Sequence, residues 1–243
     1  MEPEMIPLLP GEHFSFTCSP EVPCFNACCR DLNQFLTPYD ILRLKNCLGL
    51  PSSEFLDRYT VTHVGPETGL PVISLKQDRS KNMQCPFVGP EGCAVYADRP
   101  SSCRMYPLAR ALSRSRETGE TTEHFALLKE PHCKGFSNRE TMTADDWVSR
   151  QGLETYNAMN DRLMTLISLK NRLLPGALEP RLAKLFHLAL YDLDNFRQAI
   201  LEKDLLAGLK VEDEILSKIR TDDVELLKLG LKWIRLKLFG NAE

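Results

Sequence analysis

Residues 18–29 read CSPEVPCFNACC, so one short stretch holds four cysteines, two of them adjacent. Five further cysteines follow along the chain, and we group four of them, Cys85, Cys93, Cys103 and Cys133, with this stretch. Thiolate sulfur is a soft, charged ligand that selects Zn(II), Cu(I) or iron–sulfur clusters over Mg(II) or Ca(II). The pattern therefore predicts a metal site in the first part of the fold, with up to eight ligands: Cys18, Cys24, Cys28, Cys29, Cys85, Cys93, Cys103 and Cys133.

The number of thiols constrains the kind of centre. One tetrahedral metal takes four ligands, so eight thiolates fit two four-ligand sites, one polynuclear site with bridging sulfurs, or one four-ligand site with reserve thiols. Successive side chains of an extended segment point to opposite faces. We therefore expect the adjacent Cys28 and Cys29 to serve more than one metal, with one of the pair lying between two subsites.

The cellular compartment decides whether such thiols are ligands or disulfides. The N-terminus, MEPEMIPLLPGEHF, has no basic segment followed by an apolar core, unlike a secretory signal. A cytoplasmic location is the expectation, and thiols there are usually reduced. Clustered cysteines in that compartment more often bind metal or take part in catalysis than form structural disulfides. Disulfides are the alternative.

Several familiar motifs are absent from the sequence. The cysteines form neither a CxxxCxxC loop nor the paired CxxC knuckles of a zinc ribbon, and no P-loop, GxGxxG, HExxH or GxSxG is present. With eight thiols available, we place no histidine in the site: His13, His63, His124, His132 and His187. Cys47 also stays outside it, because the helical pattern around it indicates a small buried apolar residue.

Composition limits the partners. The 243 residues carry 30 Lys and Arg against 33 Asp and Glu, a formal charge of −3, and no long single-sign run. Nothing here favours nucleic-acid binding, and no apolar run approaches the roughly 20 residues that span a bilayer. All nine cysteines precede residue 140. We expect an α+β fold in two parts, a cysteine-cluster metal-binding module over residues 1–140 and an α-helical region over 141–243.

Local signals predict the elements of the first part. Thr37 and Pro38 start a helix of about ten residues that ends near Gly49, and a second short helix runs from Ser52 or Ser53 through Tyr59. Two hairpins follow, in which residues 61–64 pair with 70–75 and residues 106–114 pair with 123–128.

The second part reads as three or four helices. One long amphipathic helix extends from Trp147 through Ile167, and another from Pro180 to Ile200; residues 211–219 and 224–239 complete the region. The last helix is apolar around much of its circumference, with a basic strip of Lys228, Lys232 and Arg235. Such a helix is usually buried. A homo-oligomer or protein-partner surface is the alternative, and membrane-surface binding a minor one.

The cysteines sit in a longer signature. The stretches that carry it are Phe16-Thr17-Cys18, Cys24, Cys28-Cys29, Cys85-Pro86-Phe87, Cys93-Ala94-Val95-Tyr96, Arg99-Pro100, Cys103-Arg104-Met105-Tyr106-Pro107 and Cys133-Lys134-Gly135. This pattern resembles the YkgJ-type cysteine-cluster (CxxCxxCC) family over about residues 14–135. Five residues separate Cys18 from Cys24, where that family usually has two.

The resemblance implies a function. Members of that family are described as zinc- or iron-chelating proteins, so it implies a centre of zinc, iron or an iron–sulfur cluster. The family includes flagellin lysine methylases, which implies as an alternative a metal-dependent enzyme acting on a protein substrate with S-adenosylmethionine. A helical interaction module stabilised by structural zinc is a further alternative. Whether the chain is an enzyme stays open at this point, and so do any catalytic residues.

Two arginines lie among the thiols. Arg99 and Arg104 could use charge and hydrogen bonds to stabilise negative thiolates or to bind an anionic substrate. The alternative is that they hold the loop by pairing with Asp98 and nearby carbonyls. Neither choice is favoured by the sequence.

Overall fold

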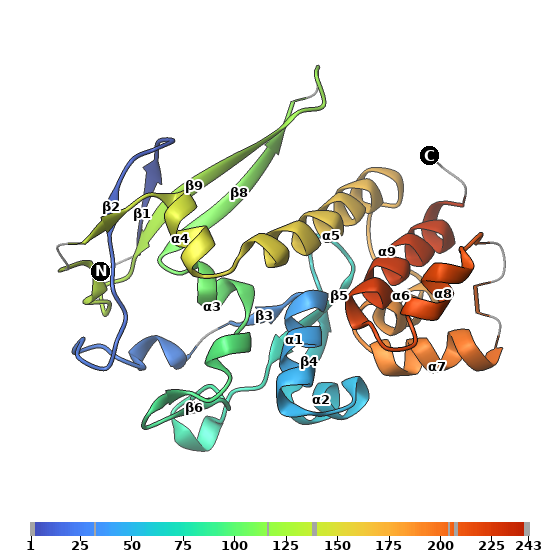
Figure 1. Ribbon diagram of the computed structural model, residues 1–243, viewed down its shortest axis with the longest axis horizontal. Helices are drawn as coiled ribbons and strands as arrows, with labels where there is room; N and C mark the ends of the chain where they lie inside the picture. Colours follow the sequence, from blue (N-terminus) through green and yellow to red (C-terminus); the bar gives the residue numbers. More distant parts are fainter. Residues whose placement is uncertain are drawn as a thin grey trace. The chain divides into compact units, whose positions relative to one another are not determined.

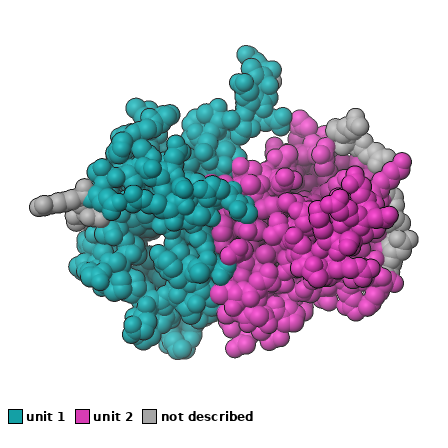
Figure 2. All heavy atoms as spheres, viewed as in Figure 1, with its two compact units in different colours: residues 1–32, 77–155 teal, residues 33–76, 156–243 magenta. Residues whose placement is uncertain are grey.

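The computed structural model describes residues 3–31, 33–115, 117–137, 140–203, 205–206 and 209–240. Helices combine with small antiparallel sheets, so the expected α+β class is confirmed (Figure 1). Contacts divide the chain into two compact units: unit 1 holds residues 1–32 and 77–155, and unit 2 holds residues 33–76 and 156–243 (Figure 2). Because contacts do not test independent folding, the domain boundary near residue 140 stays a prediction.

The main sheet of unit 1 has three antiparallel strands in the order β1-β9-β8. Strand β9 (Thr121–Lys129) pairs along its length with β8 (Leu108–Arg114), and its second half pairs with β1 (Glu4–Leu8). Figure 1 shows β8 and β9 as a long hairpin with β1 beside β9. The hairpin predicted between residues 106 and 128 is thereby confirmed, with strand ends shifted by about two residues.

Short elements complete unit 1. Strand β2 (Phe14–Ser15) pairs with β10 (Thr141–Met142), and β6 (Val88–Gly89) pairs with β7 (Gly92–Cys93). The helices are η1 (Ala27–Cys29), η2 (Arg79–Lys81), η3 (Tyr96–Asp98), α3 (Ser101–Met105), η4 (Gly135–Ser137) and α4 (Ala144–Arg150). Loops and single turns therefore carry most of the cysteines.

An aromatic cluster forms the core beside these loops. The Phe16 ring lies 5.6 Å from Tyr106, 5.6 Å from Trp147 and 5.2 Å from Phe136, centroid to centroid. The buried Trp147 indole N–H donates to the carbonyls of Arg104 (3.2 Å) and Met105 (3.0 Å). Aromatic edge contacts and these bonds tie segment 14–17 to the end of α3.

Unit 2 begins with the elements that the sequence signals most clearly. Thr37 caps α1 (Pro38–Leu48) in a reciprocal capping box with Asp40, and Gly49 ends the helix at φ +63°. Helix α2 (Ser52–Tyr59) follows, and β4 (Thr60–Val64) and β5 (Pro71–Leu75) form the predicted hairpin, with β3 (Phe35–Leu36) on the other side of β5.

The helices after residue 140 differ from the prediction. The expected helix from Trp147 to Ile167 is two helices, α4 and α5 (Glu154–Leu173), because Gly152 adopts φ +60° between them. The expected helix from Pro180 to Ile200 is likewise divided into α6 (Pro180–Leu190) and α7 (Leu193–Lys203). Apolar periodicity continues across both breaks, so it did not reveal them.

The last helix, α9 (Asp223–Phe239), is largely buried. Its contacts are with α1, α6, α7 and α8 (Asp213–Lys218), and Trp233 and Ile234 are fully covered. Gly230 permits the close approach to α6, since a Cβ there would lie 2.3 Å from the Ala189 carbonyl oxygen. The apolar circumference of α9 is thus explained by packing. Within the described residues, no helix is both long enough and apolar enough to cross a membrane.

Candidate metal centre

All eight cysteines of the predicted site lie in unit 1, although they span residues 18–133. Cys47 lies in unit 2, on α1, and is exposed. Setting Cys47 apart from the site agrees with this separation, but the expectation that it is buried was wrong, because it lies on the solvent-facing side of an amphipathic helix.

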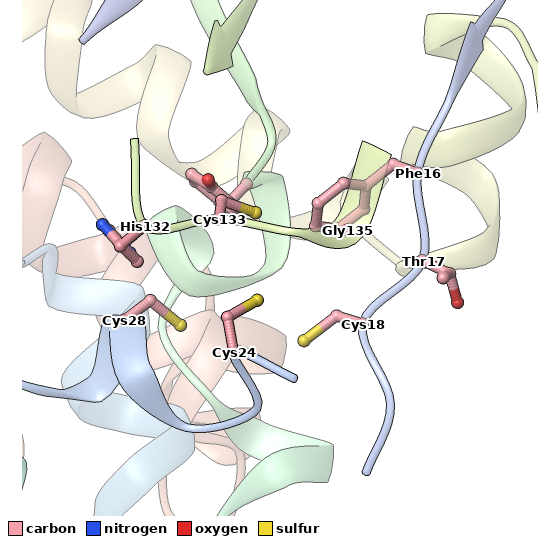
Figure 3. Close-up of a pocket in the computed structure, with 9 residues that line it drawn as sticks. Phe16, Thr17, Cys18, Cys24, Cys28, His132, Cys133 and Gly135 are labelled. Atoms are coloured by element: carbon pink, nitrogen blue, oxygen red, sulfur yellow. The ribbon is translucent and has the colours of Figure 1, made fainter. Parts of the chain in front are cut away.

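Four of the thiols line one small pocket. Cys18, Cys24, Cys28 and Cys133, here called the pocket thiols, surround a cavity of about 30 Å³ together with Phe16, Thr17, Tyr106, His132 and Gly135. Figure 3 shows them on three separate segments, facing one another across the pocket. The tertiary fold therefore brings Cys133 next to cysteines more than a hundred residues earlier.

A close backbone contact holds two of these segments together. The Thr17 N–H donates to the Gly135 carbonyl at 2.9 Å. A Cβ on Gly135 would lie 2.5 Å from the Thr17 carbonyl oxygen and 2.6 Å from the Phe16 ring, so only glycine fits. The next residue back, Lys134, donates its N–H to the Cys24 sulfur at 3.1 Å. These contacts place Cys133 opposite Cys18 and Cys24.

The adjacent cysteines sit in a tight turn and not in an extended segment. Asn26 starts η1 at φ +64°, and Cys28 and Cys29 occupy its last two positions. Successive residues of a 3₁₀ helix are about 120° apart, so the two side chains still diverge. The Cys29 thiol donates a hydrogen bond to Cys28, which lowers the pKa of Cys28 to about 7 and raises that of Cys29.

The other four cysteines form a second group, here called the turn thiols: Cys29, Cys85, Cys93 and Cys103. The Cys85 N–H donates to the Cys29 carbonyl at 2.9 Å, and Val88 pairs with Cys93 across the β6–β7 hairpin. Cys29 lies close enough to Cys85 and Cys103 for their charges to raise its pKa further. Cys103 is exposed on α3.

Backbone donors face two of the turn thiols. Burial raises the pKa of Cys85, and the N–H groups of Phe87 and Val88, which donate to its sulfur, oppose that effect. Burial likewise raises the pKa of Cys93, opposed by the Val95 N–H. Each of these donors follows its cysteine by two or three residues. Such N–H to sulfur bonds stabilise the thiolate, which is the form that binds metal.

The pocket thiols have a different electrostatic setting. Partial desolvation raises the pKa of Cys18 to about 11, although part of the residue is exposed, and the neighbouring Cys28, Cys24 and Cys133 add to the increase. The charge of Glu130 also acts against the thiolate at Cys28. A group of thiols that repel one another's negative charge is stabilised by a cation placed among them.

The two arginines have separate roles. Arg104 donates to the carbonyls of Arg99 (3.1 Å), Gln151 (2.6 Å) and Ala97, so it holds the loop. Arg99 is 8 % exposed. Its guanidinium donates to the Tyr96 carbonyl at 2.7 Å and to the Gln151 side chain, and it lies 3.8 Å from the centre of the Tyr96 ring. Its charge also acts on Cys93 and Cys103, and least strongly on Cys18.

Sequence reasoning did not select two further residues of the pocket. His132 lines the cavity, and its Nε2 lies 3.6 Å from a Glu130 carboxylate oxygen. The Tyr106 hydroxyl is buried and meets no partner at hydrogen-bonding geometry among the described residues. Burial raises the pKa of Tyr106, and the nearby Cys133 thiol adds to the effect. The signature contained Tyr106, but only the fold brings its hydroxyl to the thiols.

The cysteine sulfurs are suitable ligands for a soft metal ion, but they are not arranged around a single point. Within the described ranges, no three Cys, His, Asp or Glu side chains are arranged to hold a metal ion as they stand. Thiol side chains turn about one or two single bonds, and the pocket thiols already face one space. Metal binding would therefore require rotation of cysteine side chains onto the ion.

A family model matches residues 17–157, which is more than half of the chain, under the description "CxxCxxCC: Putative zinc- or iron-chelating domain". The chain belongs to this CxxCxxCC family. The match includes all eight cysteines of unit 1, and the resemblance read from the sequence is confirmed. Searches of the curated proteins and of the solved structures found no match.

Membership in the CxxCxxCC family supports metal binding of the zinc- or iron-chelating kind. The matched region ends within α5, so the helices from residue 158 onward lie outside it. The family description gives neither the metal nor the ligands that this chain uses.

Proposed function

We propose that the chain binds two zinc or iron ions through its eight cysteines, one ion at the pocket thiols and one at the turn thiols. The supporting observation is the gathering of Cys18, Cys24, Cys28 and Cys133 around one pocket. The remaining four interact with one another through charge and backbone pairing. Two tetrahedral thiolate sites account for all eight ligands.

The adjacent pair divides between the two groups. Cys28 belongs to the pocket thiols and Cys29 to the turn thiols, and their thiols are hydrogen-bonded to each other. The two sites would consequently be neighbours. Each of the two ions would then take one of its ligands from this adjacent pair.

Metal analysis of the protein tests the proposal. We expect about two metal ions per chain in anaerobically purified protein, with acid-labile sulfide present only if the centre is an iron–sulfur cluster. Replacement of one thiol in each group, by Cys133→Ser and Cys93→Ser, should remove about one ion each. Cys47→Ser is the matched control and should retain both. A purified protein that retains no zinc or iron, even after addition of either metal, would refute the proposal.

A further inference from the structure

Charged side chains act on both cysteine groups, and Arg99 acts on thiols of each. Next to the turn thiols lies the buried guanidinium of Arg99, whose positive charge favours thiolates at Cys93 and Cys103. Next to the pocket thiols lies the Glu130 carboxylate, which acts against a thiolate at Cys28 and whose backbone carbonyl accepts the Cys133 N–H at 3.0 Å. A divalent ion with four thiolates carries a net charge of about −2. Arg99 would stabilise that charge at the turn thiols. At the pocket, Glu130 would oppose it, and Arg99 would offset part of that opposition at Cys18.

The sulfur positions are also held differently. Backbone donors within the same turn fix the Cys85 and Cys93 sulfurs, so these do not depend on distant contacts. At the pocket, the Cys24 sulfur accepts from Lys134, which is 110 residues away in the chain. That bond lasts only while segment 132–135 stays packed against segment 16–18. The position of Cys24 in the pocket therefore depends on a contact between distant segments, whereas the Cys85 and Cys93 sulfurs are held within their own turns.

The Tyr106 hydroxyl gives an independent indication at the pocket. Its oxygen is buried and meets no partner at full hydrogen-bonding geometry among the described residues, and the group that acts on it is the neighbouring Cys133 thiol. A buried hydroxyl with so weak a partner is unfavourable. A neutral thiol is a weak acceptor, but a metal-bound thiolate is a strong one. The hydroxyl lies near Cys133 and Cys28. Metal binding at the pocket would turn this neighbouring thiol into a strong acceptor.

We propose that the pocket thiols form an exchangeable metal site and the turn thiols a structural one, with the Tyr106 hydroxyl donating to a metal-bound thiolate of the pocket. This inference rests on the proposed function, since it assumes that both groups bind metal. Exposure does not separate the sites, because Cys18 and Cys103 are both exposed. The sites differ in the charge around them, in the backbone support of their sulfurs and in the buried phenol beside the pocket.

Metal release measured over time tests this assignment. Metal-free protein is reconstituted with two equivalents of Zn²⁺ and mixed with a chromophoric chelator. We expect one equivalent to leave fast and one slowly. Tyr106→Phe should accelerate the fast phase about tenfold, the effect of one hydrogen bond to a charged acceptor. Glu130→Gln should slow it. Neither change should alter the slow phase. Tyr156→Phe, a buried tyrosine in unit 2, is the matched control.

A spectroscopic measurement separates hydrogen bonding from general loosening. In the Co²⁺-substituted protein, loss of the Tyr106 donor should move a thiolate-to-cobalt charge-transfer band to lower energy, since the thiolate is no longer stabilised. Both variants keep all eight thiols, so a folding defect of a cysteine variant does not affect the result.

The outcomes are distinct. Release of both equivalents in a single phase, or a Tyr106→Phe effect on the slow phase alone, overturns the assignment of the two sites while leaving metal binding intact. Failure to take up either Zn²⁺ or iron overturns the proposed function, and this inference with it.

Discussion

The Gly135 carbonyl accepts the Thr17 N–H at 2.9 Å, and this one bond joins the two ends of the cysteine region across the pocket. The two segments are so close that a side chain at residue 135 would collide with the Thr17 backbone. A position without an obvious chemical role thus determines whether Cys133 reaches the other pocket thiols.

Gly135→Ala should therefore remove metal from the pocket and destabilise the fold by about 1–3 kcal/mol, the usual effect of overpacking. The added Cβ would lie 2.5 Å from the Thr17 carbonyl oxygen, so the segments must separate. Gly89→Ala is the control, because a Cβ there would meet only the Gly92 carbonyl at 3.9 Å. Zinc content and thermal unfolding measure both effects. Unchanged zinc content in Gly135→Ala would contradict this prediction.

In metal-free protein, Cys28 should react with iodoacetamide much faster than Cys18 at pH 7. The pKa of Cys28 is lowered to about 7 by the bond from Cys29, whereas that of Cys18 is raised to about 11 by partial desolvation and the neighbouring thiols. The thiolate is the reactive form. Peptide mass mapping of the Cys47→Ser protein gives the rates. The Cys28 rate should level off above about pH 8, while the Cys18 rate keeps rising; equal rates at pH 7 would count against the pairing.

Removal of the Lys45 ammonium should destabilise unit 2 strongly. Its Nζ lies 2.9 Å from Asp223 and 3.2 Å from Asp194, and the residue is 5 % exposed. Lys45→Met leaves the two carboxylates with Arg197, and we expect a loss of about 2–4 kcal/mol. Urea unfolding measures this loss of unfolding free energy. Lys218→Met breaks an exposed pair with Glu214 and should have no measurable effect.

The same network makes stability depend on pH. Burial tends to raise the pKa of Asp223, but bonds from Lys45, Asn46 and Arg197 outweigh it and lower the pKa. A lowered pKa contributes stability above the unfolded value of about 4, and that contribution disappears as pH falls through the folded value. Asp223→Asn should thus reduce stability at pH 7 and have progressively less effect toward pH 2. A constant difference across this range would show that Asp223 is not responsible.

Much of the local structure was predictable because its causes are local. The capping box at Thr37, the glycine at the end of α1 and the turn around residues 65–69 act through neighbours in the chain, and these elements appear where expected. The helix breaks at Gly152 and Asp192 were missed, since apolar residues continue at helical spacing on both sides.

The sequence by itself determined the family, because the family depends on residue types at fixed spacings, and it predicted the eight candidate thiols from the same pattern. Only the tertiary structure decided which cysteines face one pocket, and it added Tyr106, His132 and Gly135 to their surroundings. It also placed Cys47 in the other unit. The physical reason is that Cys18 and Cys133 meet through contacts between distant segments, such as that of Thr17 with Gly135, and spacing along a chain does not encode such contacts.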